Sequence, residues 1–150
     1  MLSIEDRLNI QELKYSYFDK VDKKKWNELY DLFIPDAVID LSEALEEDIA
    51  PKQPSNGIFH GGEAFVKFVS AVLIDITTVH RGFNPIITGY EPDAASGRWS
   101  MEDMFFVDDG GQLKPVFRGL GHYEETYARV NGVWKYRSLK LTRVYTQRFS

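Results

Sequence analysis

The chain has 150 residues, a formal net charge of −5 and 43% hydrophobic residues, which suits one domain built around a single core. It contains no cysteine, so disulfides, cysteine-ligated zinc and a thiolate nucleophile are excluded. Its basic residues are scattered, so we expect no nucleic-acid and no membrane partner. The N-terminus lacks a leader pattern and no apolar run approaches about 20 residues, so we expect a cytoplasmic protein.

A first helix is predicted over residues 4–20 because apolar side chains recur there every three or four positions. The stripe consists of Ile10, Leu13, Tyr17 and Val21. Ser3, followed three residues later by Asp6, resembles a capping box and marks the start of this helix.

A second, shorter helix is predicted directly after Asp22, which lies where an N-cap residue is expected. Pro35 should end this helix, because proline disfavours helical backbone in the residue before it. Residues 37–42 are predicted to form a short strand. Residues 43–57 are acidic, contain two prolines and have no clear period, which predicts a mobile loop or lid.

Helical spacing returns over residues 61–75, and from Ile76 onward the period changes toward two, as in strands. The turn signals "GYEPD", "DDGG" and "VNG" separate four long strands in hairpin connection, and Asn131-Gly132 is the strongest of these turns. This order predicts an α+β fold in which a curved, mainly antiparallel sheet wraps around three N-terminal helices. Such a sheet leaves a concave mouth where ligand pockets form.

Four segments carry a resemblance to a known family: "YFDKVDKKKWNELYDLF", "VHRGFNP", "SGRWSMED" and "YARVNGVWKY". In this order they resemble the SnoaL-like branch of the nuclear transport factor 2-like superfamily over nearly the whole chain, except residues 43–57. Within that branch they are most similar to bile-acid 7-alpha-dehydratases, and more distantly to scytalone dehydratase and hexachlorocyclohexane dehydrochlorinase. The resemblance implies a cone-shaped, cystatin-like fold with an internal pocket, no cofactor, and a homodimer or homotrimer.

The resemblance also implies site residues. In those lyases, an aspartate after the first helix and a histidine on the strand after the third helix form a dyad, which corresponds here to Asp22 and His80. Two pocket tyrosines correspond to Tyr17 and Tyr123, and an arginine near the end of the last strand corresponds to Arg143.

These residue types suit the removal of water, or the movement of a proton, next to a carbonyl. A neutral imidazole accepts a proton near neutral pH, so His80 is the candidate base, and Asp22 would fix its tautomer. Tyr17 would donate a hydrogen bond to the developing enolate oxygen, with help from Tyr123. Arg143 would orient a carboxylate or carbonyl of a small hydrophobic, polycyclic or steroid-like substrate.

Structural explanations stay open for the same residues. Asp22 can be only a helix cap, and Tyr17 continues an apolar stripe, as a core tyrosine does. Arg143 can belong to a surface ion pair. His122, next to Tyr123 in sequence, is expected to line the pocket, and no histidine motif predicts a metal site.

Two other functions are compatible with the sequence: ketosteroid-isomerase-type proton transfer, and a non-catalytic small-molecule-binding or assembly subunit like the dioxygenase small subunits. A separation of more than about 6 Å between His80 and Asp22, or a filled pocket, would favour the non-catalytic alternative. The acidic residues of the later strands are interpreted as mainly structural or solvent-facing. They are Glu102, Asp103, Glu124 and Glu125.

Overall fold

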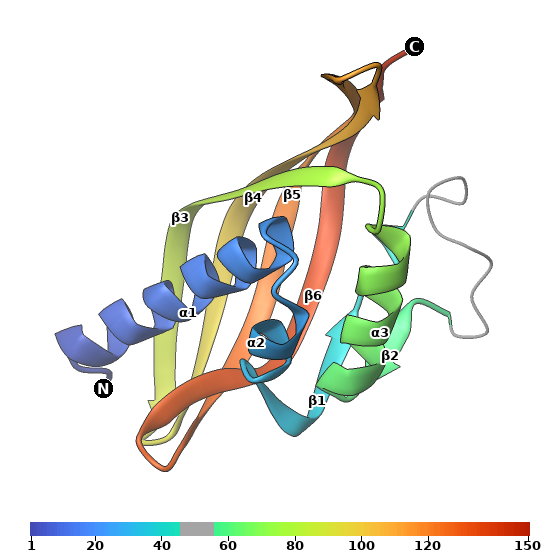
Figure 1. The fold of residues 1–150 in the computed structure, drawn as a ribbon. Coiled ribbons are helices and arrows are strands. Elements are labelled where there is room, and N and C mark those ends of the chain that lie inside the picture. Colours follow the sequence, from blue (N-terminus) through green and yellow to red (C-terminus); the bar gives the residue numbers. More distant parts are fainter. Residues whose placement is uncertain (46–55) are drawn as a thin grey trace.

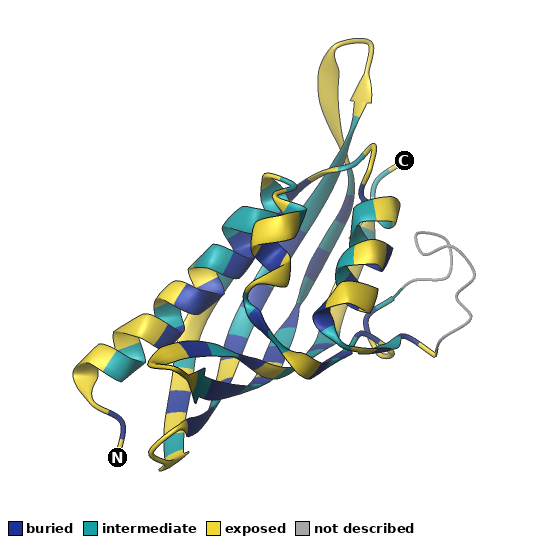
Figure 2. Ribbon diagram, turned by 60° about the horizontal axis from the view of Figure 1, so that its bottom comes forward, coloured by how far each residue is buried: buried dark blue, intermediate teal, exposed yellow. Residues whose placement is uncertain are grey.

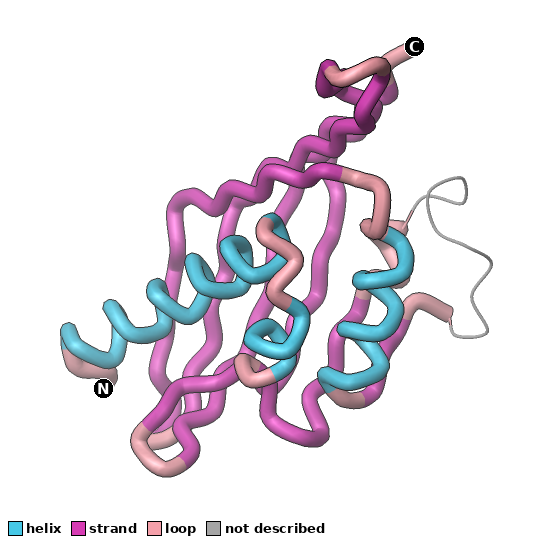
Figure 3. Tube along the Cα trace, viewed as in Figure 1, coloured by secondary structure: helices cyan, strands magenta, loops and turns pink. Residues whose placement is uncertain are grey.

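The computed structural model describes residues 1–45 and 56–150. The helices are α1 (Ile4–Asp22), α2 (Trp26–Tyr30) and α3 (Gly62–Val72). The strands are β1 (Phe33–Asp40), β2 (Ile58–His60), β3 (Thr77–Glu91), β4 (Ala94–Asp109), β5 (Gln112–Val130) and β6 (Val133–Arg148). Figure 1 shows the helices together on one side of a curved sheet, and Figure 3 shows the same two layers by secondary structure.

The six strands lie in the order β2-β1-β6-β5-β4-β3, and every neighbouring pair is antiparallel except β1 and β6. Strands β3 to β6 follow one another through the three predicted turns. At the last of these, Asn131 and Gly132 have φ values of 52° and 80°, the positive values that a tight I′ hairpin turn requires. The predicted α+β fold with a curved, mainly antiparallel sheet and three helices is confirmed.

Helix α1 packs against the sheet through the stripe that the sequence predicted, and its opposite side is exposed (Figure 2). All four apolar members of the stripe are buried: Ile10, Leu13, Tyr17 and Val21. The capping box is also present, because the Ser3 hydroxyl accepts from the Asp6 N–H at 2.9 Å and the Asp6 carboxylate accepts from the Ser3 N–H at 3.2 Å. The helix therefore starts where the sequence signal placed it.

The segment after α1 differs from the prediction. Helix α2 ends at Tyr30, and the strand begins at Phe33 and already contains Pro35. The pairing of β1 with β6 shifts between Phe33 and Val38, so the proline falls where the ladder is interrupted and its missing N–H costs no strand bond.

The three-residue strand β2, which pairs with β1, was not predicted. Most of the predicted loop or lid at residues 43–57 lies outside the described residues. Among the helices of the described chain, none is long and apolar enough to cross a membrane.

Candidate active site

Asp22 and His80 meet between the end of α1 and the start of β3. His80 Nδ1 lies 2.6 Å from Asp22 Oδ1, and the His80 backbone N–H donates to Oδ2 at 3.0 Å. The Thr78 hydroxyl donates to Oδ1 at 2.9 Å. Because an ionised carboxylate only accepts hydrogen bonds, this contact places a proton on Nδ1, and in the neutral imidazole Nε2 is then the acceptor.

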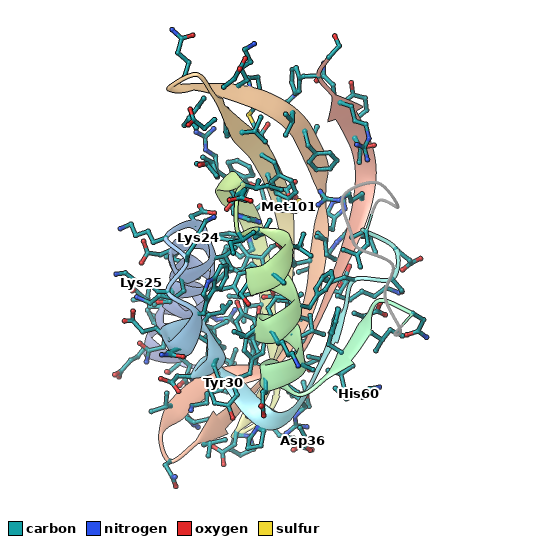
Figure 4. All side chains as sticks on the ribbon, turned by 45° about the vertical axis from the view of Figure 1, so that its right-hand side comes forward. Lys24, Lys25, Tyr30, Asp36, His60 and Met101 are labelled. Carbon is teal, nitrogen blue, oxygen red and sulfur yellow. The ribbon has the colours of Figure 1, made fainter. Side chains whose placement is uncertain are left out.

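The interpretation of Asp22 as a helix cap is wrong. Asp22 is the last residue of α1, and α2 begins at Trp26 with Lys25 at its N-cap position and no side-chain cap. The carboxylate bonds to β3 instead. The run from Lys23 to Lys25 follows the C-terminus of α1, where positive charge suits the helix dipole, and Figure 4 shows Lys24 and Lys25 there.

Helix α1 runs two residues beyond its predicted end at residue 20 and so includes both Tyr17 and Asp22. Both belong to α1, and five residues of helix turn them roughly 140° apart. Tyr17 faces the core and the cavity described next, whereas Asp22 reaches that cavity only through His80.

A cavity of about 90 Å³ opens between α1, α3 and the inner face of the sheet. Helix α3 supplies much of its apolar wall: Phe65, Phe68, Val69 and Val72. Its polar lining is Tyr17, His80, Asp103, Tyr123 and Arg143. A mostly apolar lining with a few convergent polar groups is typical of small-molecule sites.

Asp103 is a site residue that the sequence interpretation missed. Only 1% of it is exposed, and its carboxylate accepts two hydrogen bonds from the Arg143 guanidinium, at 2.8 and 2.9 Å. Its Oδ2 lies 3.9 Å from His80 Nε2. The signal was available: along β4, Trp99 and Met101 alternate onto the buried face, and the next residue in that period is an acid.

Gly119 leaves the space in which Asp103 pairs with Arg143. Asp103 on β4 is the register partner of Gly119 on β5, and Arg143 on β6 is the register partner of Gly121, two residues further along β5. A Cβ at Gly119 would lie 1.9 Å from Arg143 Nη1 and 2.5 Å from Asp103 Oδ1. The guanidinium crosses β5 in the space that the missing side chain leaves.

Tyr17 and Tyr123 lie edge to face, with ring centroids 6.2 Å apart, and both are buried. Burial raises the pKa of both phenols, and a hydrogen bond with the Tyr123 side chain opposes part of that rise at Tyr17. Both groups therefore stay protonated at neutral pH, as hydrogen-bond donors must be.

His122 does not lie with these residues. Side chains alternate along β5, so His122 points to the opposite face of the sheet from Tyr123, and it is not among the described residues that line the cavity. The expectation that it lines the pocket is wrong. His60 is exposed on β2, at the edge of the molecule (Figure 4).

A curved sheet covered by helices, with a cavity between the two layers, is the architecture of the cystatin-like and nuclear transport factor 2-like class of proteins. A protein with a cystatin-like fold from Nostoc punctiforme has the same fold, with a TM-score of 0.66 and 22% identity over 95% of this chain and 93% of that chain. The SnoaL-like domain family matches residues 2–140, and the chain belongs to this family.

Other solved structures share the fold. A Novosphingobium aromaticivorans protein provisionally named an aromatic ring hydroxylase is 27% identical, with a TM-score of 0.82 over 99% of this chain and 96% of that one. A protein provisionally named a scytalone dehydratase from the same species is 19% identical, with a TM-score of 0.77 over 98% and 89%. A hexachlorocyclohexane dehydrochlorinase, LinA type 2, is 21% identical, with a TM-score of 0.76 over 98% and 90%.

Proposed function

We propose that this protein is a cofactor-independent lyase, a dehydratase that removes water across the bond next to a substrate carbonyl. The observation that carries the proposal is the 2.6 Å contact between His80 Nδ1 and Asp22 Oδ1, because it frees Nε2 in the wall of an apolar cavity. The dehydratase and dehydrochlorinase names among the proteins of similar fold support the same class of reaction.

In the proposed reaction His80 Nε2 takes a proton from the carbon next to the carbonyl, and the C–H electrons form the enolate. Tyr17 and Tyr123 donate hydrogen bonds to the enolate oxygen. The enolate then re-forms the carbonyl and a new C=C bond as the hydroxyl leaves, and the imidazolium returns its proton to that hydroxyl to give water. The carboxylates of Asp22 and Asp103 flank the ring, so they stabilise the imidazolium between the two steps.

The charges around His80 favour a substrate that is neutral at its reacting end. Arg143 already donates two hydrogen bonds to Asp103, and a third, from Nε, reaches the Ala44 carbonyl at 3.1 Å. We therefore assign Arg143 to holding Asp103 rather than to binding a substrate carboxylate. A hydrophobic, steroid-like or other polycyclic hydroxy-ketone suits the apolar wall and the resemblance to bile-acid 7-alpha-dehydratases.

Ketosteroid-isomerase-type chemistry would begin with the same proton abstraction and would return the proton to a different carbon. The dehydratase and dehydrochlorinase names among the proteins of similar fold favour the dehydratase. Analysis of the product, for loss of water or for a shifted double bond, distinguishes the two. We also expect the protein to act as a homodimer or homotrimer, which light scattering after size-exclusion chromatography measures.

The test is a screen of hydroxy-steroids and hydroxy-ketones, followed by absorbance of the conjugated product and comparison of variants. For a substrate that turns over, His80→Ala and Asp22→Asn should lower kcat by about 10²- to 10⁴-fold, the usual contribution of a general base. His60→Ala, at an exposed histidine on β2, is the matched control and should keep the wild-type rate. Wild-type rates in both dyad variants, with folds intact by circular dichroism, would refute the proposal.

A further inference from the structure

A buried ion pair lies behind the two tyrosines of the cavity. Lys14 Nζ donates to Glu125 Oε2 at 2.5 Å, and neither side chain has any exposed surface. Of the two interpretations of Glu125 from the sequence, structural or solvent-facing, the second is wrong because solvent does not reach this side chain. Lys14 belongs to the buried face of α1, and neither residue is among the described residues that line the cavity.

The Lys14 ammonium is enclosed by aromatic rings. Nζ lies 3.2 Å from the centroid of the Tyr123 ring, 4.6 Å from that of Tyr17 and 4.8 Å from that of Phe18. These distances are within the range at which a cation is attracted to a ring face. The ammonium therefore contacts from behind the same two phenols that line the cavity in front.

The carboxylate of Glu125 is held just as firmly. Its Oε1 accepts from the Tyr127 hydroxyl at 2.7 Å, and that hydroxyl accepts from Trp99 Nε1 at 3.2 Å. This chain of donors fixes the position of Glu125, which in turn fixes the position of the ammonium. The network of Glu125, Tyr127 and Trp99 thus holds Lys14 against the tyrosines, and none of these three residues is among the described residues that line the cavity.

Stability does not explain why the pair is there. Removing two charges from water costs free energy that the mutual attraction rarely exceeds, and apolar replacements of buried pairs are often neutral or stabilising. Burial lowers the pKa of Lys14 to about 8 and raises that of Glu125, as this cost requires. At neutral pH the ammonium form still predominates, so the rings face a full positive charge.

We propose that Lys14, held by Glu125, is a positioning residue for Tyr17 and Tyr123, and that its ammonium strengthens both phenols as hydrogen-bond donors toward an oxyanion in the cavity. A cation against the ring face draws electron density from the phenol, which makes the O–H group a better donor. It also keeps both rings in place as charge develops on the ligand oxygen. This inference deepens the proposed function and rests on it, because that reaction is what needs an oxyanion.

The test uses 2-naphthol, an aromatic alcohol whose neutral and ionised forms absorb at different wavelengths. Bound naphtholate stands in for the enolate, so the ratio of bound naphtholate to bound naphthol measures how strongly the phenols donate. Lys14→Met/Glu125→Gln removes both charges and keeps an acceptor for Tyr127, and it should lower this ratio on the order of tenfold. Arg98→Met/Glu124→Gln removes an exposed ion pair on the other face of β4 and β5 and should leave the ratio unchanged.

A background without the phenols separates positioning from general damage. In Tyr17→Phe/Tyr123→Phe, adding Lys14→Met/Glu125→Gln should cause no further loss, because the residues through which Lys14 acts have lost their hydroxyls. An equal loss in both backgrounds, or a wild-type ratio in Lys14→Met/Glu125→Gln, would overturn the proposal. The readout needs no turnover, so it can fail separately from the lyase assignment, which fails when His80→Ala and Asp22→Asn both keep the wild-type rate.

Discussion

Two clusters of paired polar side chains lie where α1 meets the inner face of the sheet, and one of them lines the cavity whereas the other is sealed from it. The cavity cluster is Asp22, His80, Asp103 and Arg143, and the sealed cluster is Lys14, Glu125, Tyr127 and Trp99. In each cluster the carboxylates accept hydrogen bonds from nitrogen or hydroxyl donors. The side chains of His80 and Asp22 keep 9% and 24% of their surface exposed, whereas those of Lys14 and Glu125 keep none.

The difference in access decides what each cluster can do. In the proposed reaction a proton passes between His80 Nε2 and a ligand, because His80 lines the cavity, with Asp103 beside that nitrogen. Among the residues that the structure describes, the Lys14 ammonium contacts aromatic rings and the Glu125 carboxylate, so we expect it to act on a ligand through the tyrosines between them. Breaking one partner of either cluster should therefore have distinguishable effects on stability and on activity.

The largest expected effect comes from breaking the sealed cluster on one side. Lys14→Met leaves the Glu125 carboxylate buried without its cation, so we expect the free energy of unfolding to fall by about 3–5 kcal/mol. Urea unfolding followed by circular dichroism measures this loss. Lys14→Met/Glu125→Gln should lie within about 1 kcal/mol of wild type. Equal losses in the single and double variants would show that the pair is not the cause.

The sealed cluster also predicts a dependence of stability on pH. The pKa of Lys14 is about 8 in the folded protein, and it is taken as 10.5 in the unfolded chain. Between these two pH values the unfolded chain therefore binds more protons than the folded protein does. The free energy of unfolding should therefore rise with pH from about 8 toward 10.5, by at most about 3 kcal/mol. Urea unfolding of wild type and of Lys14→Met/Glu125→Gln is measured at several pH values. The difference between their free energies of unfolding isolates this pair from the other titrating groups. A flat difference would contradict the lowered pKa.

Much of the fold could be predicted because the apolar period reports directly on which side chains are buried. The stripe of α1, the helical spacing of α3 and the three hairpin turns lie where the period and the turn residues predicted them. Strand β2 could not be predicted because it has only three residues, too few to show a period. The start of β1 was missed because proline is a stronger signal for ending a helix than for interrupting a ladder.

The candidate site was less predictable because its members are joined by the sheet rather than by the sequence. The resemblance to a family named Asp22 and His80, but local sequence suggested a cap for Asp22, and only the position of β3 shows otherwise. Asp103, Glu125 and Lys14 each occupy a position whose periodic neighbours are buried and apolar or aromatic. A charged residue on a buried face is the pattern that would have identified all three.

The cavity cluster can be broken without touching any of its members. Gly119→Ala adds a methyl group in the space that the Arg143 guanidinium occupies, so it should separate Arg143 from Asp103 and cost about 1–3 kcal/mol of stability. Thermal unfolding and kcat measure the two consequences. Shortening Arg143 relieves the clash, so Gly119→Ala should cost less stability in an Arg143→Met background than in wild type. Equal costs in the two backgrounds would place the strain elsewhere.

The smallest expected effect tests how Asp22 is held. Thr78→Val keeps the shape of the side chain and removes one of the donors to Asp22 Oδ1, while the His80 backbone N–H and ring still hold the carboxylate. We expect a loss of about 1 kcal/mol in the free energy of unfolding and a several-fold lower kcat, because the imidazole is oriented less firmly. Thr77→Val, at the exposed neighbour on the same strand, is the control for the change of residue type. If both valine variants behave alike, β3 does not hold Asp22 through this hydroxyl, and the ring and backbone bonds of His80 suffice to fix the dyad.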